Sequence, residues 1–125
     1  MARLLIVDGV ETECGWMRRV LEATQHAVAE ARHSAEALNR LREQPGRVDL
    51  VIAALHTPLV SGIELIRSLR ALRPPVKVLA VAGDEPPDHS ADEALLFSQV
   101  FGADAILYTP FTGDELLTVV ARLLG

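Results

Sequence analysis

The sequence predicts an α/β domain in which helices cover both faces of a five-stranded parallel sheet. Its apolar residues form short continuous runs, segments with helical spacing lie between the runs, and strand and helix alternate five times along 125 residues. Strands joined by helices pair in parallel through right-handed crossovers, so the fold class is a doubly wound (βα)5 sheet. A chain of this length corresponds to a single domain, which we place at residues 1–125.

Five segments are predicted to be strands. Four of them are apolar without alternation, as expected for strands that are covered on both faces of a parallel sheet. These four segments are residues 4–7, 48–55, 76–82 and 105–108, and the weaker fifth is residues 27–31.

The segments between the strands have the spacing of amphipathic helices, with apolar residues at every third or fourth position. One such series is Val10, Cys14, Met17 and Leu21, and another is Ile63, Ile66, Leu69 and Leu72.

Three helix starts are predicted from capping boxes, in which a hydroxyl residue and a glutamate three positions later satisfy free amides reciprocally. The pairs are Ser61 with Glu64, Ser90 with Glu93, and Thr112 with Glu115. The last two pairs precede helices that we expect at residues 91–101 and 113–124.

The composition excludes several classes of protein. Half of the residues are hydrophobic and 23% are charged, which excludes a disordered chain. The net charge of -5 and the absence of a Lys/Arg cluster argue against a direct nucleic-acid partner. Cys14 is the only cysteine, which favours a reducing compartment, and no apolar run is long enough to span a bilayer. We therefore expect a cytoplasmic protein with no membrane anchor or signal peptide.

A chemical site on this fold would lie where the strands end, because the carboxyl ends of parallel strands meet at one edge of the sheet. The residues predicted at that edge are Asp8, Gly9, residues 54–58, residues 82–84, Thr109 and Pro110.

The motifs at this edge resemble those of the receiver domain of bacterial response regulators, which has a flavodoxin-like fold. The resemblance rests on Leu-Leu-Ile-Val-Asp8, on Asp49-Leu-Val-Ile-Ala-Ala-Leu-His-Thr-Pro58 followed by Gly62, and on Tyr108-Thr-Pro-Phe111. It covers essentially the whole chain and implies strand order 2-1-3-4-5. It also implies a role in two-component (phosphorelay) signal transduction and a cis peptide bond before Pro110.

The phosphorylation site implied by the resemblance is degenerate. Receivers accept a phosphoryl group on an aspartate four residues before this proline, and here that position is Ala54, which has no oxygen nucleophile. The acidic pair of the magnesium site survives only as Asp8, because its second member is Gly9. One carboxylate supplies too few ligands for a cation that prefers six oxygens, so we expect Mg²⁺ binding to be weak or absent.

Three further positions depart from the family pattern. The hydroxyl residue at the end of the fourth strand aligns with Ala82, or with Ala80 in an alternative register. The lysine before the Pro-Phe pair is Thr109, and the aromatic residue of the switch is Ile106. Because a single mutation cannot explain these losses, we interpret the chain as an atypical, phosphorylation-independent receiver with no enzymatic activity and no cofactor.

Two other functions stay open. The first is a small flavodoxin-like protein that binds a ligand or nucleotide, although the sequence contains no Gly-rich phosphate-binding motif. The second is a conventional receiver that carries an engineered substitution at Ala54.

Several residues have both a structural and a functional interpretation. Asp8 is a helix cap or a metal ligand, and we favour the cap. His56 is a solvent-facing loop residue or an acceptor of metal or phosphoryl, and we favour the loop residue. Trp16 is buried or is an exposed anchor on the first helix, whose surface meets the kinase or phosphotransfer partner in the family, and we favour burial.

The resemblance implies a surface for protein partners. In the family, the fourth helix, fifth strand and fifth helix form the face used for homodimerisation or for binding a partner, which is a histidine kinase, a phosphotransfer protein or an output domain. The residues predicted to contribute are Leu96, Phe97, Phe101 and Tyr108. Internal packing of these apolar side chains is the alternative.

Overall fold

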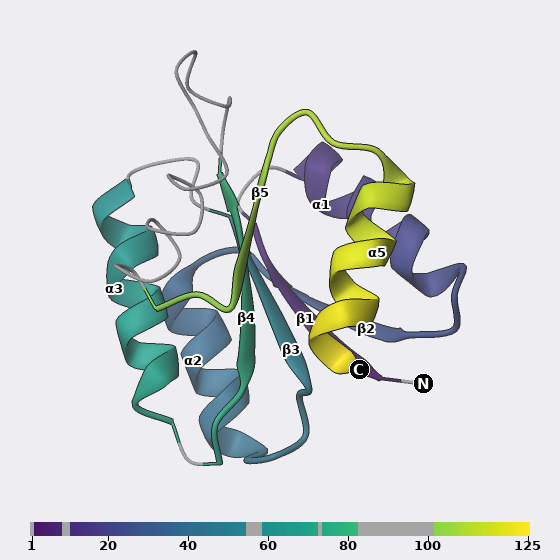
Figure 1. The fold of residues 1–125 in the computed structure, drawn as a ribbon. Helices are drawn as coiled ribbons and strands as arrows, with labels where there is room; N and C mark the ends of the chain where they lie inside the picture. Colours follow the sequence, from purple (N-terminus) through teal and green to yellow (C-terminus); the bar gives the residue numbers. More distant parts are fainter. Residues whose placement is uncertain (1, 9–10, 55–58, 73, 83–101) are drawn as a thin grey trace.

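The computed structural model describes residues 2–8, 11–54, 59–72, 74–82 and 102–125, without the side chains of residue 11 and residues 59–64 (Figure 1). The strands are β1 (Arg3–Val7), β2 (Ala27–Ala31), β3 (Leu50–Ala54), β4 (Lys77–Ala82) and β5 (Ala105–Tyr108). The helices are α1 (Glu11–Glu22), α2 (Ser34–Glu43), α3 (Leu59–Arg70) and α5 (Gly113–Leu124).

The five strands form one parallel sheet in the order β2-β1-β3-β4-β5, as predicted. Helices α1 and α5 lie on one face of the sheet, and α2 and α3 lie on the other (Figure 1). The order places β2 and β5 at the two edges. It also brings the carboxyl ends of β1, β3 and β4 together in the middle of the sheet.

The core consists of two layers of apolar side chains, one on each face of the sheet. On the α1–α5 face, Ile6, Ile52 and Leu79 lie side by side in register across β1, β3 and β4. The exposed fraction of Ile52 and of Leu79 is 0%. This two-sided burial explains why these strands show no polar alternation.

The predicted start of the third helix is wrong. Helix α3 begins at Leu59, so Ser61 is its third residue and not its cap. The first turn of a helix tolerates serine because its amides have no partner inside the helix, and the pattern therefore indicates a start only to within a turn. In α5 the prediction is confirmed, since Thr112 and Glu115 form both bonds of the capping box.

The third strand is shorter than predicted. We expected residues 48–55, and β3 starts at Leu50. Asp49, just before β3, bonds to Arg3 at the start of β1. Its amide donates to the carbonyl of Arg3, and its Oδ2 accepts from the Arg3 amide at 2.8 Å. This side chain completes the hydrogen bonding at the amino end of β1.

At the amino end of the strands, an ion pair joins Arg70, the last residue of α3, to Asp104, which lies just before β5. The Asp104 Oδ2 accepts from Arg70 Nη2 at 2.6 Å and from the Val78 amide at 2.7 Å. Arg70 also donates to the carbonyls of Gly102 and Val76. These bonds hold the amino end of β5 against the amino end of β4. They lie at the end of the sheet opposite to the carboxyl edge.

Candidate functional site

Five of the positions predicted at the carboxyl edge are described, and four of them, all except Pro110, carry or replace side chains of the predicted site. Asp8 follows β1, Ala54 and Ala82 end β3 and β4, and Thr109 follows β5. Because β1, β3, β4 and β5 are successive neighbours in the sheet, these residues form one row across the edge. The row contains one carboxylate, two methyl groups and one hydroxyl.

Asp8 is a buried residue, with an exposed fraction of 4%. Its backbone amide donates to the carbonyl of Ala31 at 3.0 Å and so extends the pairing of β1 with β2. Helix α1 begins at Glu11, three residues later. The interpretation of Asp8 as a cap and its interpretation as a metal ligand both stay predictions.

Thr109 occupies the position of the family lysine and bonds to the end of β4. Its amide donates to the carbonyl of Ala82 at 3.0 Å, and its hydroxyl Oγ1 lies 3.4 Å from the same oxygen. Ala82 is the last residue of β4 and is paired with Tyr108, whereas Ala80 lies deeper in the strand beside Ala53. The geometry therefore places Ala82, and not Ala80, at the edge.

The loop after β5 is anchored on the first helix. The peptide bond between Thr109 and Pro110 is cis, as the resemblance implied. The ring of Phe111 then packs on Trp16 of α1 at a centroid distance of 5.6 Å and an angle of 56°. Trp16 is half-buried in this contact, which lies between the two alternatives predicted for it.

Other predicted residues are described only in part. Tyr108 is half-buried on the edge strand β5, and Ile106 packs against the core on the α2–α3 face. The other predictions lie outside the described residues. They are the helix at residues 91–101, the edge residues 55–58 and 83–84, Gly9, His56, Ser90 with Glu93, Leu96, Phe97 and Phe101.

Two local features were missed in the sequence. His33 caps α2, because its Nδ1 accepts from the Glu36 amide at 3.3 Å while Glu36 Oε2 accepts from the Arg32 amide at 3.1 Å. The imidazole takes the place of the usual capping hydroxyl, but the Glu36 carboxylate bonds to the residue before the cap, so this is not a full capping box. The pattern His-x-x-Glu was the available signal. The second feature is a groove along α2, which no linear pattern reveals.

The thiol of Cys14 is buried on α1 and faces acidic groups. Burial, followed by the nearby carboxylate of Glu30, raises its pKa from 9.0 to about 12. Asp8 acts in the same direction, and Arg18 opposes the shift. Below about pH 9 the thiol is protonated in both the folded and the unfolded chain. As the pH rises from about 9 to about 12 the unfolded chain ionises first, so the fold loses stability in this range.

Cys14 is expected to react slowly while the protein is folded. The thiolate is the reactive form, and a pKa raised by this amount lowers the thiolate fraction near pH 8 about 1000-fold relative to the unfolded chain. The measurement is the release of chromophore from an aromatic disulfide reagent, with and without urea. Because the chain has one cysteine, all of the signal comes from Cys14. Equal rates in the two conditions would contradict the burial of this thiol.

The described part of the chain contains neither a cluster of metal ligands nor a membrane-spanning helix. No three His, Cys, Asp or Glu side chains within it lie close enough together to hold a metal ion. Within the same residues, every helix is too short or too polar to cross a membrane.

Comparison with known proteins decides the family. The model of the response regulator receiver domain matches residues 4–121. The chain belongs to the receiver domain family of response regulators. Receivers of this kind act in two-component signal transduction, and they are in general signalling domains without enzymatic activity of their own.

Several curated proteins contain a segment similar to this receiver. Sensor kinase CckA of Brucella abortus is 32% identical over 124 residues, which are 97% of this chain and 12% of that protein. Transcriptional regulatory protein PrrA of Mycobacterium tuberculosis is 30% identical over 122 residues, with coverage of 98% and 49%. The chain therefore spans less than half the length of these relatives.

Solved receivers have the same fold. A CheY-like receiver domain protein from Methanospirillum hungatei has a TM-score of 0.81 and 27% identity, covering 99% of this chain and 94% of that one. A response regulator from Chloroflexus aurantiacus has a TM-score of 0.82 and 23% identity, with coverage of 98% and 97%. The doubly wound sheet is thus the receiver fold, as the sequence predicted.

Proposed function

We propose that this receiver transmits its signal through protein contacts and does not accept a phosphoryl group at Ala54. The observation that carries the proposal is the row at the carboxyl edge, where Ala54 and Ala82 present methyl groups and Thr109 carries no charge. Residues 1–125 act as one receiver unit, consistent with the family match over nearly all of them.

The chemistry of phosphoryl transfer supports this proposal. An acceptor must supply an oxygen nucleophile, and a cation must neutralise the charge that develops on the transferred group. Ala54 cannot supply the first, and Thr109 cannot supply the second. Asp8 is the one carboxylate in the described row, which is too few ligands for tight binding of Mg²⁺.

In this proposal the signal comes from binding of a protein partner and not from phosphorylation. Receivers in two-component systems interact with kinases and output domains, and the half-buried aromatic pair of Trp16 and Phe111 lies beside the carboxyl edge. Half-buried aromatic residues are frequent anchors at interfaces. A histidine kinase, a phosphotransfer protein or an output domain is the proposed partner at α1.

The face with Tyr108, Leu96, Phe97 and Phe101 is proposed for a homodimer. A cytoplasmic location fits these partners and the single free cysteine.

Incubation with acetyl phosphate and Mg²⁺ tests the proposal. Intact-mass measurement is expected to show no phosphoryl adduct on this protein, whereas a receiver that retains the aspartate, treated in parallel, gains one. Titration with beryllofluoride should leave the amide spectrum of residues 8 and 54 unchanged. A stoichiometric, acid-stable adduct would overturn the phosphorylation-independent function.

A further inference from the structure

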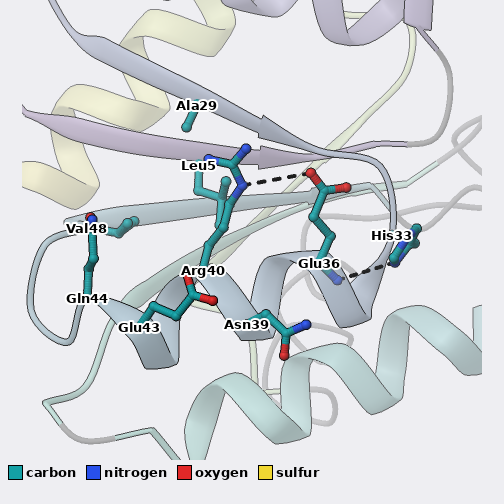
Figure 2. Close-up of a pocket in the computed structure, with 9 residues that line it drawn as sticks. All are labelled: Leu5, Ala29, His33, Glu36, Asn39, Arg40, Glu43, Gln44 and Val48. Carbon is teal, nitrogen blue, oxygen red and sulfur yellow. Dashed lines mark hydrogen bonds and ion pairs between the residues drawn. The ribbon is translucent and has the colours of Figure 1, made fainter.

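A groove of about 650 Å³ runs along α2, between this helix and the part of the sheet formed by β1 and β2 (Figure 2). Its volume is within the range of protein ligand sites, about 300–1,000 Å³. The apolar residues that line it are Leu5, Ala29 and Val48. The polar residues are His33, Glu36, Asn39, Arg40, Glu43 and Gln44.

The groove lies next to an edge of the sheet that has free backbone groups. Ala27 donates its amide to the carbonyl of Ala2, and the carbonyl of Ala31 accepts from Asp8, so residues 27, 29 and 31 direct their backbone groups toward β1. Backbone direction alternates along a strand. The amides and carbonyls of Val28 and Glu30 therefore point away from the sheet, where an additional strand would pair.

Side chains do not guard this edge. Glu30 is the one charged residue of β2, and its carboxylate is drawn toward α1, where Arg18 Nη1 lies 3.5 Å from Glu30 Oε1. On the face toward α2, β2 presents Ala29 and Ala31, which are small. A strand added about 4.8 Å from β2 would thus direct every second side chain into the groove.

The charged side chains that line the groove favour an extended segment with a basic side chain. Glu36 and Arg40 form an ion pair of 3.8 Å along α2 (Figure 2). Glu43 follows on the same side of the helix, and it has no ion-pair partner among the described residues. With two glutamates and one arginine, the lining of the groove carries one net negative charge, which lies at Glu43. A basic side chain entering the groove would meet the Glu43 carboxylate.

We propose that the edge of β2 and the groove along α2 bind an extended, basic segment of a partner protein by strand addition. The backbone of the segment pairs with Val28 and Glu30, and its alternate side chains, at least one of them lysine or arginine, enter the groove. This surface is formed by elements other than the row of Ala54, Ala82 and Thr109, so the proposal stands or falls independently of phosphorylation.

The probe is a short acetylated and amidated peptide in which valine and lysine alternate, titrated into the ¹⁵N-labelled protein. We expect the largest amide shifts at Val28 and Glu30, with hydrogen exchange at these two amides slowed by about tenfold. No shift at millimolar peptide, or shifts confined to other elements, would overturn the proposal.

Two matched pairs of variants assign the interaction. Glu30→Pro removes the outward amide and is expected to abolish binding, whereas Glu30→Gln keeps the amide and should bind as the unmodified protein does. Glu43→Lys is expected to weaken binding about fivefold, and Asp114→Lys, which makes the same charge change on α5, should not. The Glu43→Lys pair decides the matter if Glu30→Pro does not fold. Light scattering that shows a dimer dependent on β2 would instead assign the edge to a second copy and overturn the proposal.

Discussion

Ala54→Asp alone is expected to leave phosphoryl labelling slow, and adding Thr109→Lys is expected to raise the labelling rate by about 100-fold. The aspartate supplies a nucleophile, but the charge on the transferred group is still not neutralised. Removing one charge-stabilising donor from a catalytic site typically slows reaction by 10²–10³, and we expect a similar factor when one is restored. The rate is measured with acetyl phosphate and Mg²⁺ by intact mass.

The structure allows the lysine at this position. Thr109 is half-buried, and its backbone amide, which does not depend on the side chain, makes the 3.0 Å bond to Ala82. The substitution gives up only the longer contact of the hydroxyl, at 3.4 Å.

Thr109→Met in the Ala54→Asp background is the matched control, because it adds a long side chain without charge. Gly9→Asp, which restores the second acid, should increase the dependence of labelling on Mg²⁺. Rapid labelling of Ala54→Asp by itself would instead support a conventional receiver altered at one position.

Ile52→Ala is expected to lower the free energy of unfolding by about 3–4 kcal/mol. Ile52 is completely buried in β3, and it lies in register between Ile6 and Leu79 of the neighbouring strands. Truncation there leaves a cavity that the flanking strands cannot close without breaking their ladders. Since a domain of this size is stable by about 5–15 kcal/mol, the loss is a large fraction of the total.

Urea unfolding followed by circular dichroism measures this effect. Ile52→Val removes one methylene and should cost only about 1 kcal/mol, while Lys77→Ala, at an exposed position of β4, should change stability little. Similar costs for Ile52→Ala and Lys77→Ala would show that the two-layer core does not determine stability.

The fold could be predicted from the sequence because its strands are buried on both faces. The continuous apolar runs at β1 and β5 predicted these strands to within one residue, since burial leaves no polar position inside them. The ends were less predictable where side chains act as backbone partners. Asp49 lies just before the first residue of β3 and bonds through its side chain to Arg3, and His33 caps α2 with a ring nitrogen. Neither role follows from hydrophobicity.

The edge site was predictable in position but not in its internal bonding. Topology alone places Asp8, Ala54, Ala82 and Thr109 at the carboxyl ends of their strands. The bond from Thr109 to Ala82 depends on the register of β4 against β5, which spacing along the chain does not give. The groove along α2 was not predictable, because it depends on how far the helix lies from the last strand of the sheet.

The packing of Trp16 against Phe111 gives the protein an intrinsic optical probe. Trp16 is the only tryptophan, and the ring it touches follows directly after Pro110 in the loop that leaves β5. Indole emission therefore reports on this loop without any label. A shift in its wavelength when another molecule is added would indicate that the surroundings of the Trp16–Phe111 contact have changed, either by binding at α1 or by movement of the loop after β5.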